Sequence, residues 1–423
     1  MRAVCPPPPT CARGRACVAH PRDPPTRPRP PDAAWARRGM LGARRTRCDV
    51  RGDHVPASAP AICAIGTAVP AARLEQQAAR DLLARQPDLT RLGARLVRTA
   101  FDASAIDARH VVLDELVEPR ETPFFDVEHD ALRSPSTRVR NTRYAEHAPT
   151  LALDAASAAL ADGGLEPTSI THVVTASCTG FFAPGIDHLL VRDLGLPSST
   201  PRLHVGFMGC YAAFPALRAA DAICRADPRA VVLVVCVELC SLHLRSSSDP
   251  DTIVASSVFA DGAGAAIVAV RPQPRSSLRI DALASAIAPS SEEEMAWTIG
   301  DEGFEMVLSG AVPRLIGANV VEAIAPLADA RRAGSWPEVA GWAVHPGGRA
   351  ILDTVQRTLG LDDAALAPSR RVLAERGNMS SATVLHILQA QLRERSPGEQ
   401  VCAMAFGPGL TMESALLTMQ EPA

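Results

Sequence analysis

Apolar runs alternate with amphipathic segments along most of this chain, as in an α/β protein. Continuous apolar runs at residues 61–69, 171–176, 230–237 and 264–270 predict buried strands. Residues 74–83 and 151–160 predict helices, and Asp162-Gly163-Gly164 is a C-cap signal for the second helix. Because strands that are apolar throughout belong to sheets covered on both faces, we expect helices on either side of the sheet.

A weak internal repeat divides this part of the chain into two similar halves. Residues 171–196 and residues 338–361 both read as a strand, a Pro-Gly pair, a helix and the tripeptide Leu-Gly-Leu. Downstream, each half has a glycine-led turn that opens a helix, then a strand, a glycine-containing turn and a second strand. Four matches in the same order favour two halves about a pseudo-twofold axis. The alternative is that α/β proteins in general reuse such elements.

The first residues do not share this pattern. Residues 1–58 hold eleven prolines and twelve arginines against four aspartates, and they show no apolar periodicity. This composition predicts a disordered leader. This leader lacks the apolar core of a signal peptide. A transit peptide is one alternative. The interpretation we prefer is that the start was assigned too far upstream, and Met40 is a candidate for the true start. The predicted parts are the leader (1–58), an N-terminal half (59–272) and a C-terminal half (273–423).

One stretch combines a glycine-led turn with a reactive side chain, residues 203–220, LHVGFMGCYAAFPALRAA. A short apolar run ends at Gly206, and Cys210 follows Gly209 at the start of an alanine-rich helix. The glycine permits a tight strand-to-helix turn. Free N–H groups and the helix dipole stabilise a thiolate at a helix start, so Cys210 is predicted to be a buried, activated nucleophile.

The repeat supplies two partners for this cysteine. Asn378 stands at the equivalent helix start of the second half, and His345 ends the strand predicted at 339–344, beside Gly347 and Gly348. Imidazole can hold a thiolate as an ion pair and later donate to an oxyanion, while a neutral amide can stabilise an enolate. A histidine after a strand is usually structural and an asparagine can be an N-cap. Their joint placement nevertheless predicts a shared Cys-His-Asn site.

Composition removes several classes of function. The chain has 423 residues and a net charge of −3, and this charge argues against a general nucleic-acid surface. No apolar run approaches the roughly 20 residues of a membrane span. Eleven cysteines show neither CxxC pairs nor zinc-site spacing. Several of them lie in apolar runs, which favours buried thiols in a reducing cytoplasm over a disulfide framework: Cys63, Cys178, Cys224, Cys236 and Cys402.

From Ala61 to Met419 the chain resembles the type III polyketide synthases, the chalcone and stilbene synthase family of the thiolase superfamily, in a bacterial-like form. The resemblance implies a thiolase-like αβαβα layered fold of two pseudo-duplicated halves. The motifs that carry it are GTAVP at 66–70, GC at 209–210, VFADG at 258–262, VHPGG at 344–348, GNMSSA at 377–382 and FGPGLT at 406–411.

The resemblance also implies roles for single residues. Cys210 would carry the acyl group, and His345 with Asn378 would support decarboxylation and hold the oxyanion. Phe259 would gate the passage between a CoA tunnel and the cavity, which Cys178 and the loop with Gly407 and Pro408 would shape. The residues expected along the CoA tunnel are Arg95, Arg98, Gly347, Gly348 and Ala350.

The implied enzyme is an acyltransferase that loads an acyl-CoA starter, extends it with malonyl-CoA by decarboxylative Claisen condensation and cyclises the product. It needs no metal or redox cofactor, forms a homodimer and is cytoplasmic. Three departures from the plant enzymes favour a resorcinol, pyrone or naphthol over a chalcone: the lysines at the CoA site are missing, Cys178 replaces a threonine, and Trp297 and His243 lie near cavity positions. The starter, the number of extensions and the ring closure do not follow from the sequence.

Three other interpretations remain at this point. The ketosynthase III enzymes of fatty-acid synthesis use the same three residue types, but they usually carry His-Gln-Ala-Asn where this chain has His345-Pro346-Gly347-Gly348. A papain-like hydrolase would need its cysteine near the mature N-terminus and would not explain the repeat. A non-catalytic scaffold of the thiolase fold should lack at least one of the three residues.

Overall fold

A nine-stranded mixed sheet forms the centre of the fold in the computed structural model, which describes residues 59–270 and 275–422. The predicted leader, 1–58, lies outside the described residues. The strand order is β13-β14-β15-β10-β1-β9-β8-β6-β7. These strands are β1 (Ala61–Ala68), β6 (His172–Ser177), β7 (Arg202–Gly206), β8 (Val231–Leu239), β9 (Asp261–Ala269), β10 (Ser277–Ile287), β13 (Gly341–Val344), β14 (Gln400–Gly407) and β15 (Thr411–Gln420).

The strand order confirms the predicted duplication of the fold. Outward from the central pair β1–β10, one side gives β9, β8 and β6, and the other gives β15, β14 and β13. On one side β8 pairs antiparallel with β9 and parallel with β6; on the other, β14 pairs antiparallel with β15 and parallel with β13. Strand β7 adds one further strand to the first side only. The boundary predicted between residues 272 and 273 lies outside the described residues and stays a prediction.

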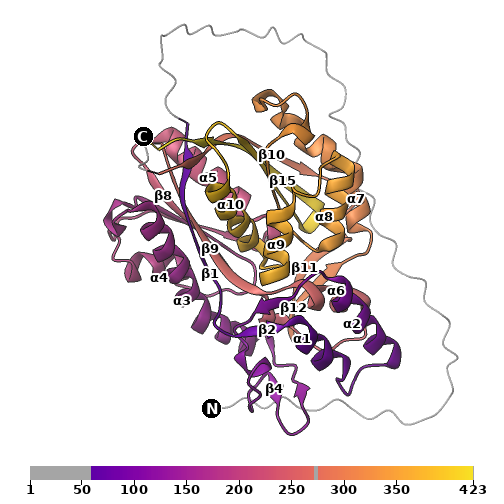
Figure 1. The fold of residues 1–423 in the computed structure, drawn as a ribbon. Helices are drawn as coiled ribbons and strands as arrows, with labels where there is room; N and C mark the ends of the chain where they lie inside the picture. Colours follow the sequence, from indigo (N-terminus) through magenta and orange to yellow (C-terminus); the bar gives the residue numbers. More distant parts are fainter. Residues whose placement is uncertain (1–58, 271–274, 423) are drawn as a thin grey trace, which may run out of the picture. The chain divides into compact units, whose positions relative to one another are not determined.

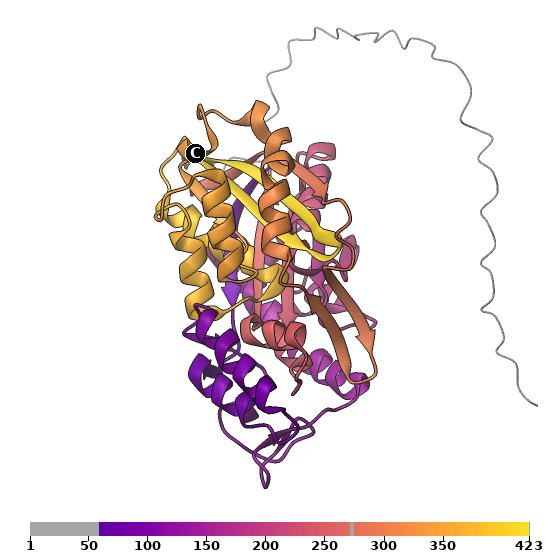
Figure 2. The same ribbon diagram turned by 90° about the vertical axis from the view of Figure 1, so that its right-hand side faces the viewer.

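Helices cover both outer faces of the two half-sheets and fill the space between them (Figure 1). The main helices are α3 (Thr137–Gly163), α4 (Ile186–Asp193), α5 (Ala213–Ala226), α7 (Val312–Ile324), α8 (Arg349–Leu359) and α10 (Thr383–Glu394). In Figure 1, α3 and α4 lie on one side of the strands and α7 and α8 on the other; Figure 2 is turned so that α7 and α8 face the viewer.

Alternate side chains along a strand belong to different apolar clusters, and this shows which helices cover each face of the sheet. In β8, Leu233 and Val235 belong to the apolar cluster that includes α3, whereas Val232 and Val234 belong to the cluster that includes α5 and α10. In β14, alternate residues likewise belong to the α5–α10 cluster and to the cluster that includes α7 and α8. Because successive strand side chains point to opposite faces, the order of layers is α3/α4, half-sheet, α5/α10, half-sheet, α7/α8. This is the αβαβα architecture expected from the sequence.

The predicted helix at 151–160 is much longer in the structure. Helix α3 begins at Thr137 and contains Pro149, so the prediction of its start was wrong. Proline lacks an N–H group and is a helix-breaking signal in sequence. The helix continues through Pro149 because its buried face, which includes Tyr144 and Ala148, packs into the first core. Its end agrees with the prediction, because Gly164 adopts the left-handed conformation of a C-cap, with φ 59°.

Smaller elements surround the sheet. The remaining α-helices are α1 (Gln76–Ala84), α2 (Arg91–Ala103), α6 (Pro250–Val258) and α9 (Ala367–Arg376). Three two-stranded pairs are β2 (Arg73–Glu75) with β3 (Ala108–His110), β4 (Phe125–Asp126) with β5 (Ala131–Leu132), and β11 (Met295–Gly300) with β12 (Gly303–Leu308). The 3₁₀ turns are η1 (Asp114–Leu116), η2 (Pro167–Ser169), η3 (Gly209–Tyr211), η4 (Cys240–His243), η5 (Ala325–Ala330), η6 (Trp336–Glu338), η7 (Ser380–Ala382) and η8 (Pro408–Leu410).

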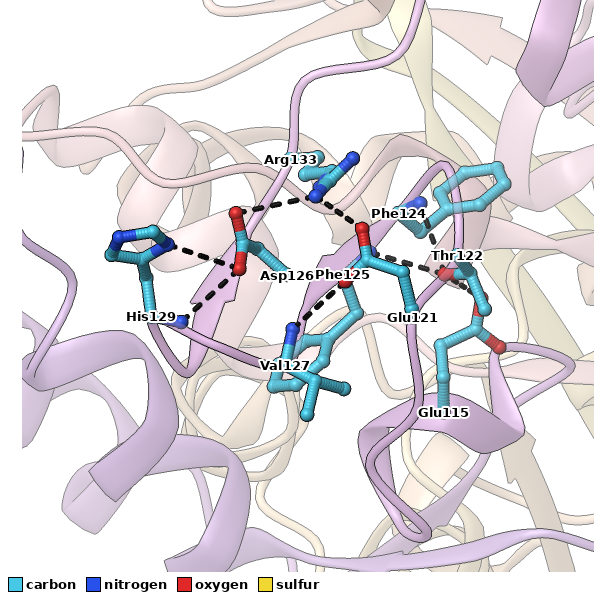
Figure 3. Close-up of polar contacts among 9 residues, drawn as sticks. All are labelled: Glu115, Glu121, Thr122, Phe124, Phe125, Asp126, Val127, His129 and Arg133. Atoms are coloured by element: carbon cyan, nitrogen blue, oxygen red, sulfur yellow. Dashed lines mark hydrogen bonds and ion pairs between the residues drawn. The ribbon is translucent and has the colours of Figure 1, made fainter.

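The β4–β5 hairpin is held mainly by side chains rather than by its short ladder (Figure 3). Arg133 forms ion pairs with both Glu121 and Asp126, the second at 3.2 Å between Nη2 and Oδ2. The Thr122 hydroxyl donates to Oε1 of buried Glu115 at 2.9 Å. Exposed ion pairs of this kind contribute little to stability, so the burial of Phe124 and Phe125 in the first core contributes more to holding the hairpin. None of the helices in the described residues is both long and apolar enough to cross a bilayer.

The contact between β1 and α3 leaves no room for a side chain at Gly66. A Cβ atom there would lie 2.2 Å from both the Ala155 carbonyl oxygen and the Ala159 nitrogen. We predict that Gly66→Ala lowers the free energy of unfolding by at least about 2 kcal/mol, because the backbones must move apart. Chemical denaturation measures this change. Gly310→Ala is the control, since a Cβ there meets nothing within 4 Å, and equal stability of the two variants would contradict the packing argument.

Candidate active site

Two helix starts in the shared α5–α10 layer bring the predicted residues together. Cys210 lies in the turn η3, which leads into α5, and Asn378 lies two residues before η7, which leads into α10. The turns η3 and η7 pack against each other. His345 follows β13 and is fully buried, while Cys210 is 6% exposed and Asn378 1%. The two halves therefore each supply one helix start to the same place, as the repeat predicts.

The three side chains line one cavity, whose empty space of about 520 Å³ includes a part open to solvent. Phe259, Cys178 and Trp297 line the same cavity. Most of its other lining atoms belong to apolar or small residues: Met295, Met306, Leu308, Gly347, Ile351, Phe406 and Pro408. The structure thus places several residues predicted from the sequence along one cavity, namely Cys210, His345, Asn378, Phe259 and Cys178, and their roles stay predictions.

The backbone around Asn378 fixes its amide while leaving the NH₂ group unused. Its N–H donates to the Val258 carbonyl at 2.9 Å, and its carbonyl accepts from the Ala260 N–H at 2.8 Å. Its side-chain oxygen accepts from the Ser380 N–H at 2.8 Å, but Nδ2 has no hydrogen-bond partner among the described residues. The amide is therefore held by its oxygen with its donor toward the cavity side of the turn.

His345 is anchored only through its main chain. Its N–H donates to the Met404 carbonyl at 2.8 Å, whereas neither ring nitrogen has a hydrogen-bond partner in the described part of the chain. Buried polar atoms nearly always have partners in native proteins, and an orphaned one calls for an explanation. Here three such atoms, from His345 and Asn378, belong to residues that line the Cys210 cavity. The arrangement can donate hydrogen bonds to an oxygen atom of a bound molecule.

Burial keeps the nucleophile and the imidazole in their neutral forms. It raises the pKa of the Cys210 thiol to about 12, with Ser380 and Asn378 acting in the opposite direction. It lowers the pKa of His345 to about 3. Burial thus acts against the thiolate expected from the sequence, and the activation of Cys210 stays a prediction. In a neutral imidazole one ring nitrogen carries no proton, so His345 offers one acceptor in the cavity that Cys210 lines.

The loop between β14 and β15 packs directly on the nucleophile turn. A Cβ atom at Gly209, whose φ is 73°, would lie 2.6 Å from Cδ of Pro408. A Cβ atom at Gly407 would lie 2.5 Å from Cδ1 of Tyr211. Both glycines are therefore required by close approach, and Pro408 is held against the cavity wall.

A buried glutamate below the cavity was missed from the sequence. Glu238 is fully buried at the end of β8 and accepts hydrogen bonds from the N–H of Cys178 at 3.0 Å and from the hydroxyls of Thr179, at 2.9 Å, and Ser381. The Cys178 thiol lies 3.5 Å from both its carboxylate oxygens. Burial raises the pKa of Glu238. The signal was visible in VVLVVCVEL, where a single carboxyl interrupts a continuous apolar strand.

A second, larger cavity adjoins the first. It has a volume of about 730 Å³ and extends between α1, α2 and α6. Phe259 and Trp297 line both cavities, as do Cys240 and Met306. The Trp297 indole N–H donates to the Cys178 carbonyl at 2.9 Å, and its ring centroid lies 6.5 Å from that of Phe259. His243 lines only the second cavity and stacks on Phe304, with centroids 4.3 Å apart.

The predicted CoA residues are not gathered in the same way. Gly347 lines the first cavity, and Gly348 follows it with φ 159°. Ala350 is exposed in the first turn of α8, and Arg95 and Arg98 are exposed on α2, lining neither cavity.

Within residues 59–270 and 275–422, no cluster of three or more His, Cys, Asp or Glu is arranged to hold a metal ion. The expectation that no cofactor is needed stays a prediction.

Comparison with known proteins identifies relatives over most of the chain. Two family models match, "Chalcone and stilbene synthases, N-terminal domain" over residues 49–272 and the corresponding C-terminal domain over residues 279–420. The probable polyketide synthase 1 of Dictyostelium discoideum is 30% identical over 362 residues, which are 84% of this chain but 11% of that protein. This chain thus spans only a small part of that relative.

Two crystal structures have a similar fold. The C-terminal type III polyketide synthase domain of Steely1, a type I/III hybrid from Dictyostelium, gives a TM-score of 0.78 at 29% identity, covering 85% of this chain and 99% of that domain. PKS-I from the brown alga Ectocarpus siliculosus gives a TM-score of 0.77 at 29% identity, covering 85% of this chain and 98% of the other.

The raised pKa of Cys210 makes its alkylation strongly dependent on pH. Only the thiolate reacts, so we predict that the rate of iodoacetamide modification of the Cys210 peptide rises about tenfold per pH unit between pH 7 and pH 9. Mass spectrometry of quenched digests measures the rate, and Cys210→Ala identifies the peptide. A rate that is already constant above pH 6 would show that a thiolate–imidazolium pair exists in the resting protein.

Proposed function

The chain belongs to the chalcone and stilbene synthase family of type III polyketide synthases, and we propose that Cys210, His345 and Asn378 are its condensing site. The proposed reaction loads an acyl-CoA starter on Cys210 and extends it with malonyl-CoA. The observation that carries the proposal is the placement of unpartnered donors of His345 and Asn378 in the cavity that holds the Cys210 thiol. Such donors suit an oxygen atom that gains charge during a reaction.

In the loading step, the Cys210 sulfur attacks the carbonyl carbon of the acyl-CoA. A ring nitrogen of His345 accepts the thiol proton and then returns it to the departing CoA sulfur. A new C–S bond to Cys210 replaces the C–S bond to CoA, so no external acid or base is consumed. Burial keeps the His345 ring neutral in the resting site, so one ring nitrogen carries no proton and is the acceptor in this step.

In the extension step, malonyl-CoA loses CO₂, and the electron pair of the broken C–C bond becomes the enolate. The Asn378 NH₂ group and the N–H of neutral His345 donate hydrogen bonds to the enolate oxygen. The enolate carbon attacks the Cys210 thioester, a C–C bond forms, and the thiolate of Cys210 leaves. Reloading of the extended chain allows further rounds, and ring closure gives a resorcinol, pyrone or naphthol.

The second cavity offers space for the acyl chain or the approach of CoA. Phe259 and Trp297 lie on the boundary between the two cavities, which suits a gate. The chain lacks lysine, and the exposed Arg95 and Arg98 line neither cavity, so the hold on the CoA phosphates by these two residues remains a prediction.

The predicted homodimer is supported by the edge strand β7. It pairs only with β6, and Leu203 on it is 46% exposed. Unpaired edge strands with apolar side chains favour association with another chain. We therefore propose a dimer formed along this edge. The cytoplasmic location stays a prediction.

Variants of the three proposed catalytic residues should separate the steps. Cys210→Ala should abolish acyl loading and polyketide formation, because the nucleophile is lost. His345→Ala and Asn378→Ala should each lower malonyl-CoA decarboxylation by about 10²–10³-fold, as for removal of an oxyanion donor. Radiolabelled malonyl-CoA with a panel of acyl-CoA starters measures CO₂ release and product mass.

Cys402→Ala is the matched control for the nucleophile, since Cys402 is equally buried but lies in β14 outside both cavities. Product formation by Cys210→Ala at the wild-type rate would rule out the proposal. Acyl transfer only from an acyl carrier protein would favour the ketosynthase III alternative.

Trp297 is predicted to limit the space open to the growing chain. Trp297→Gly should join the two cavities and raise the kcat/KM ratio of long-chain over short-chain acyl-CoA starters by at least about tenfold, the order expected for a few methylene groups. Ile299→Gly is the control, because it lies on the same strand but is 59% exposed. An unchanged ratio, with unchanged product masses, would mean that the second cavity does not receive the acyl chain.

A further inference from the structure

A buried arginine that is absent from the sequence-based site lies behind the gate. Arg109, in β3, is only 4% exposed. Its Nη1 donates to the Ser256 and Phe259 carbonyls at 2.8 and 2.7 Å, and its Nη2 donates to the Ser257 carbonyl at 2.7 Å. Nε and Nη2 also donate to the side-chain oxygen of Gln76. These contacts use all five N–H donors of the guanidinium group.

The carbonyls that Arg109 binds are those of the C-terminal end of α6. The last carbonyls of a helix have no partner within it, and they carry the negative end of the helix dipole. A guanidinium group donates hydrogen bonds to these carbonyls, and its positive charge interacts favourably with the negative end of the helix dipole. Its donors form one rigid planar set. Gln76 completes the arrangement, because its Nε2 donates to the Ser257 carbonyl and to the Ser104 hydroxyl, both at 2.9 Å.

This helix end continues into Phe259 and is hydrogen-bonded to Asn378, and both residues line the first cavity. Phe259 is the residue after α6, and its segment runs parallel to Asn378 as a β-bridge. Val258 accepts from the Asn378 N–H, and Ala260 donates to its carbonyl. Gly377, the residue before Asn378, packs closely against the same segment and against Arg109. A Cβ atom at Gly377 would lie 3.0 Å from Cβ of Ala260 and 3.5 Å from Cβ of Arg109.

Asp261 attaches the same segment to β3 from its other side. Its carboxylate accepts from the N–H groups of Val112 and Ser241, each at 2.7 Å. Residues 256–261 are thus held at both ends. Arg109 in β3 binds the first end, and Val112, which follows β3, binds the second. The segment that carries Phe259 cannot shift without breaking several buried hydrogen bonds.

We propose that Arg109 is a positioning residue that fixes the Asn378 amide through the backbone of residues 256–260. The inference rests on the proposed function for the role of Asn378 in holding the enolate oxygen. Arg109 lines the second cavity, but all its N–H donors are used by protein acceptors, so it acts on the site through these backbone contacts.

Arg109→Lys tests the proposal, because lysine keeps the charge but cannot bridge three carbonyls and Gln76. We expect malonyl-CoA decarboxylation, which depends on Asn378, to fall at least about tenfold, since small displacements of an aligned group cost that much or more. Acylation of Cys210 by a starter CoA should fall less than about threefold in the same preparation. Equal losses in both steps would reduce Arg109 to a general structural role and overturn the proposal.

A double-mutant cycle gives a second readout. In an Asn378→Ala background, Arg109→Lys should cause no further loss of decarboxylation, because its effect passes through the missing amide. Additive losses would overturn the proposal. If wild-type protein shows no decarboxylation at all, the proposed function fails, which is a different outcome from either result for Arg109.

Arg140→Lys is the matched control, since Arg140 is also buried and donates to backbone carbonyls, of Pro135, Leu242 and Leu244. It should change decarboxylation and loading by the same factor. Should Arg109→Lys fail to fold, Gln76→Ala removes one partner of Arg109 and should lower the ratio of decarboxylation to loading in the same direction. An unchanged ratio in Gln76→Ala would then contradict the proposal.

Discussion

One layer of helices is shared by two half-sheets, and the rest of the structure depends on this sharing. The apolar cluster around α5 and α10 includes strand residues from both halves, such as Val234 and Ala403. Neither half could bury its inner face alone. Because both helices begin at the same edge of this layer, their starts meet, and Cys210 and Asn378 meet with them. The site is thus a consequence of how the core is closed.

The same burial sets the chemistry of the site. In a low-dielectric enclosure an isolated charge is costly, which keeps Cys210 and His345 neutral, but a hydrogen bond to a developing charge is strengthened. Glu238 and Arg109 show how buried charged groups are accommodated nearby. Each uses its hydrogen-bonding capacity on protein groups, Glu238 on Cys178, Thr179 and Ser381, and Arg109 on the end of α6. Among the residues that line the cavity of Cys210, by contrast, His345 and Asn378 have polar side-chain atoms without a protein partner.

The features that could be predicted from the sequence are those with a local sequence pattern. Glycine before Cys210 and before Asn378 indicates tight turns, and continuous apolar runs indicate covered strands, so the duplicated fold could be predicted, as could the placement of Cys210, His345 and Asn378 along one cavity. The start of α3 could not, because Pro149 breaks the helical signal and only burial against the first half-sheet compensates. Glu238 and Arg109 depend on partners far along the chain, and the second cavity depends on side chains from many elements. The placement of Arg95 and Arg98 away from both cavities likewise followed only from the structure.

The contact between Pro408 and the turn before Cys210 links two features that would otherwise vary independently. The loop that borders the cavity comes from the second half, and the nucleophile turn comes from the first, yet the two leave no room for a Cβ atom at Gly209 or Gly407. A change of shape in this loop therefore also displaces the turn that carries Cys210. Trp297 and His243 line the cavities from β11 and η4 instead. Substitutions at these two positions can reshape the cavity walls without passing through the contact between Gly209 and Pro408.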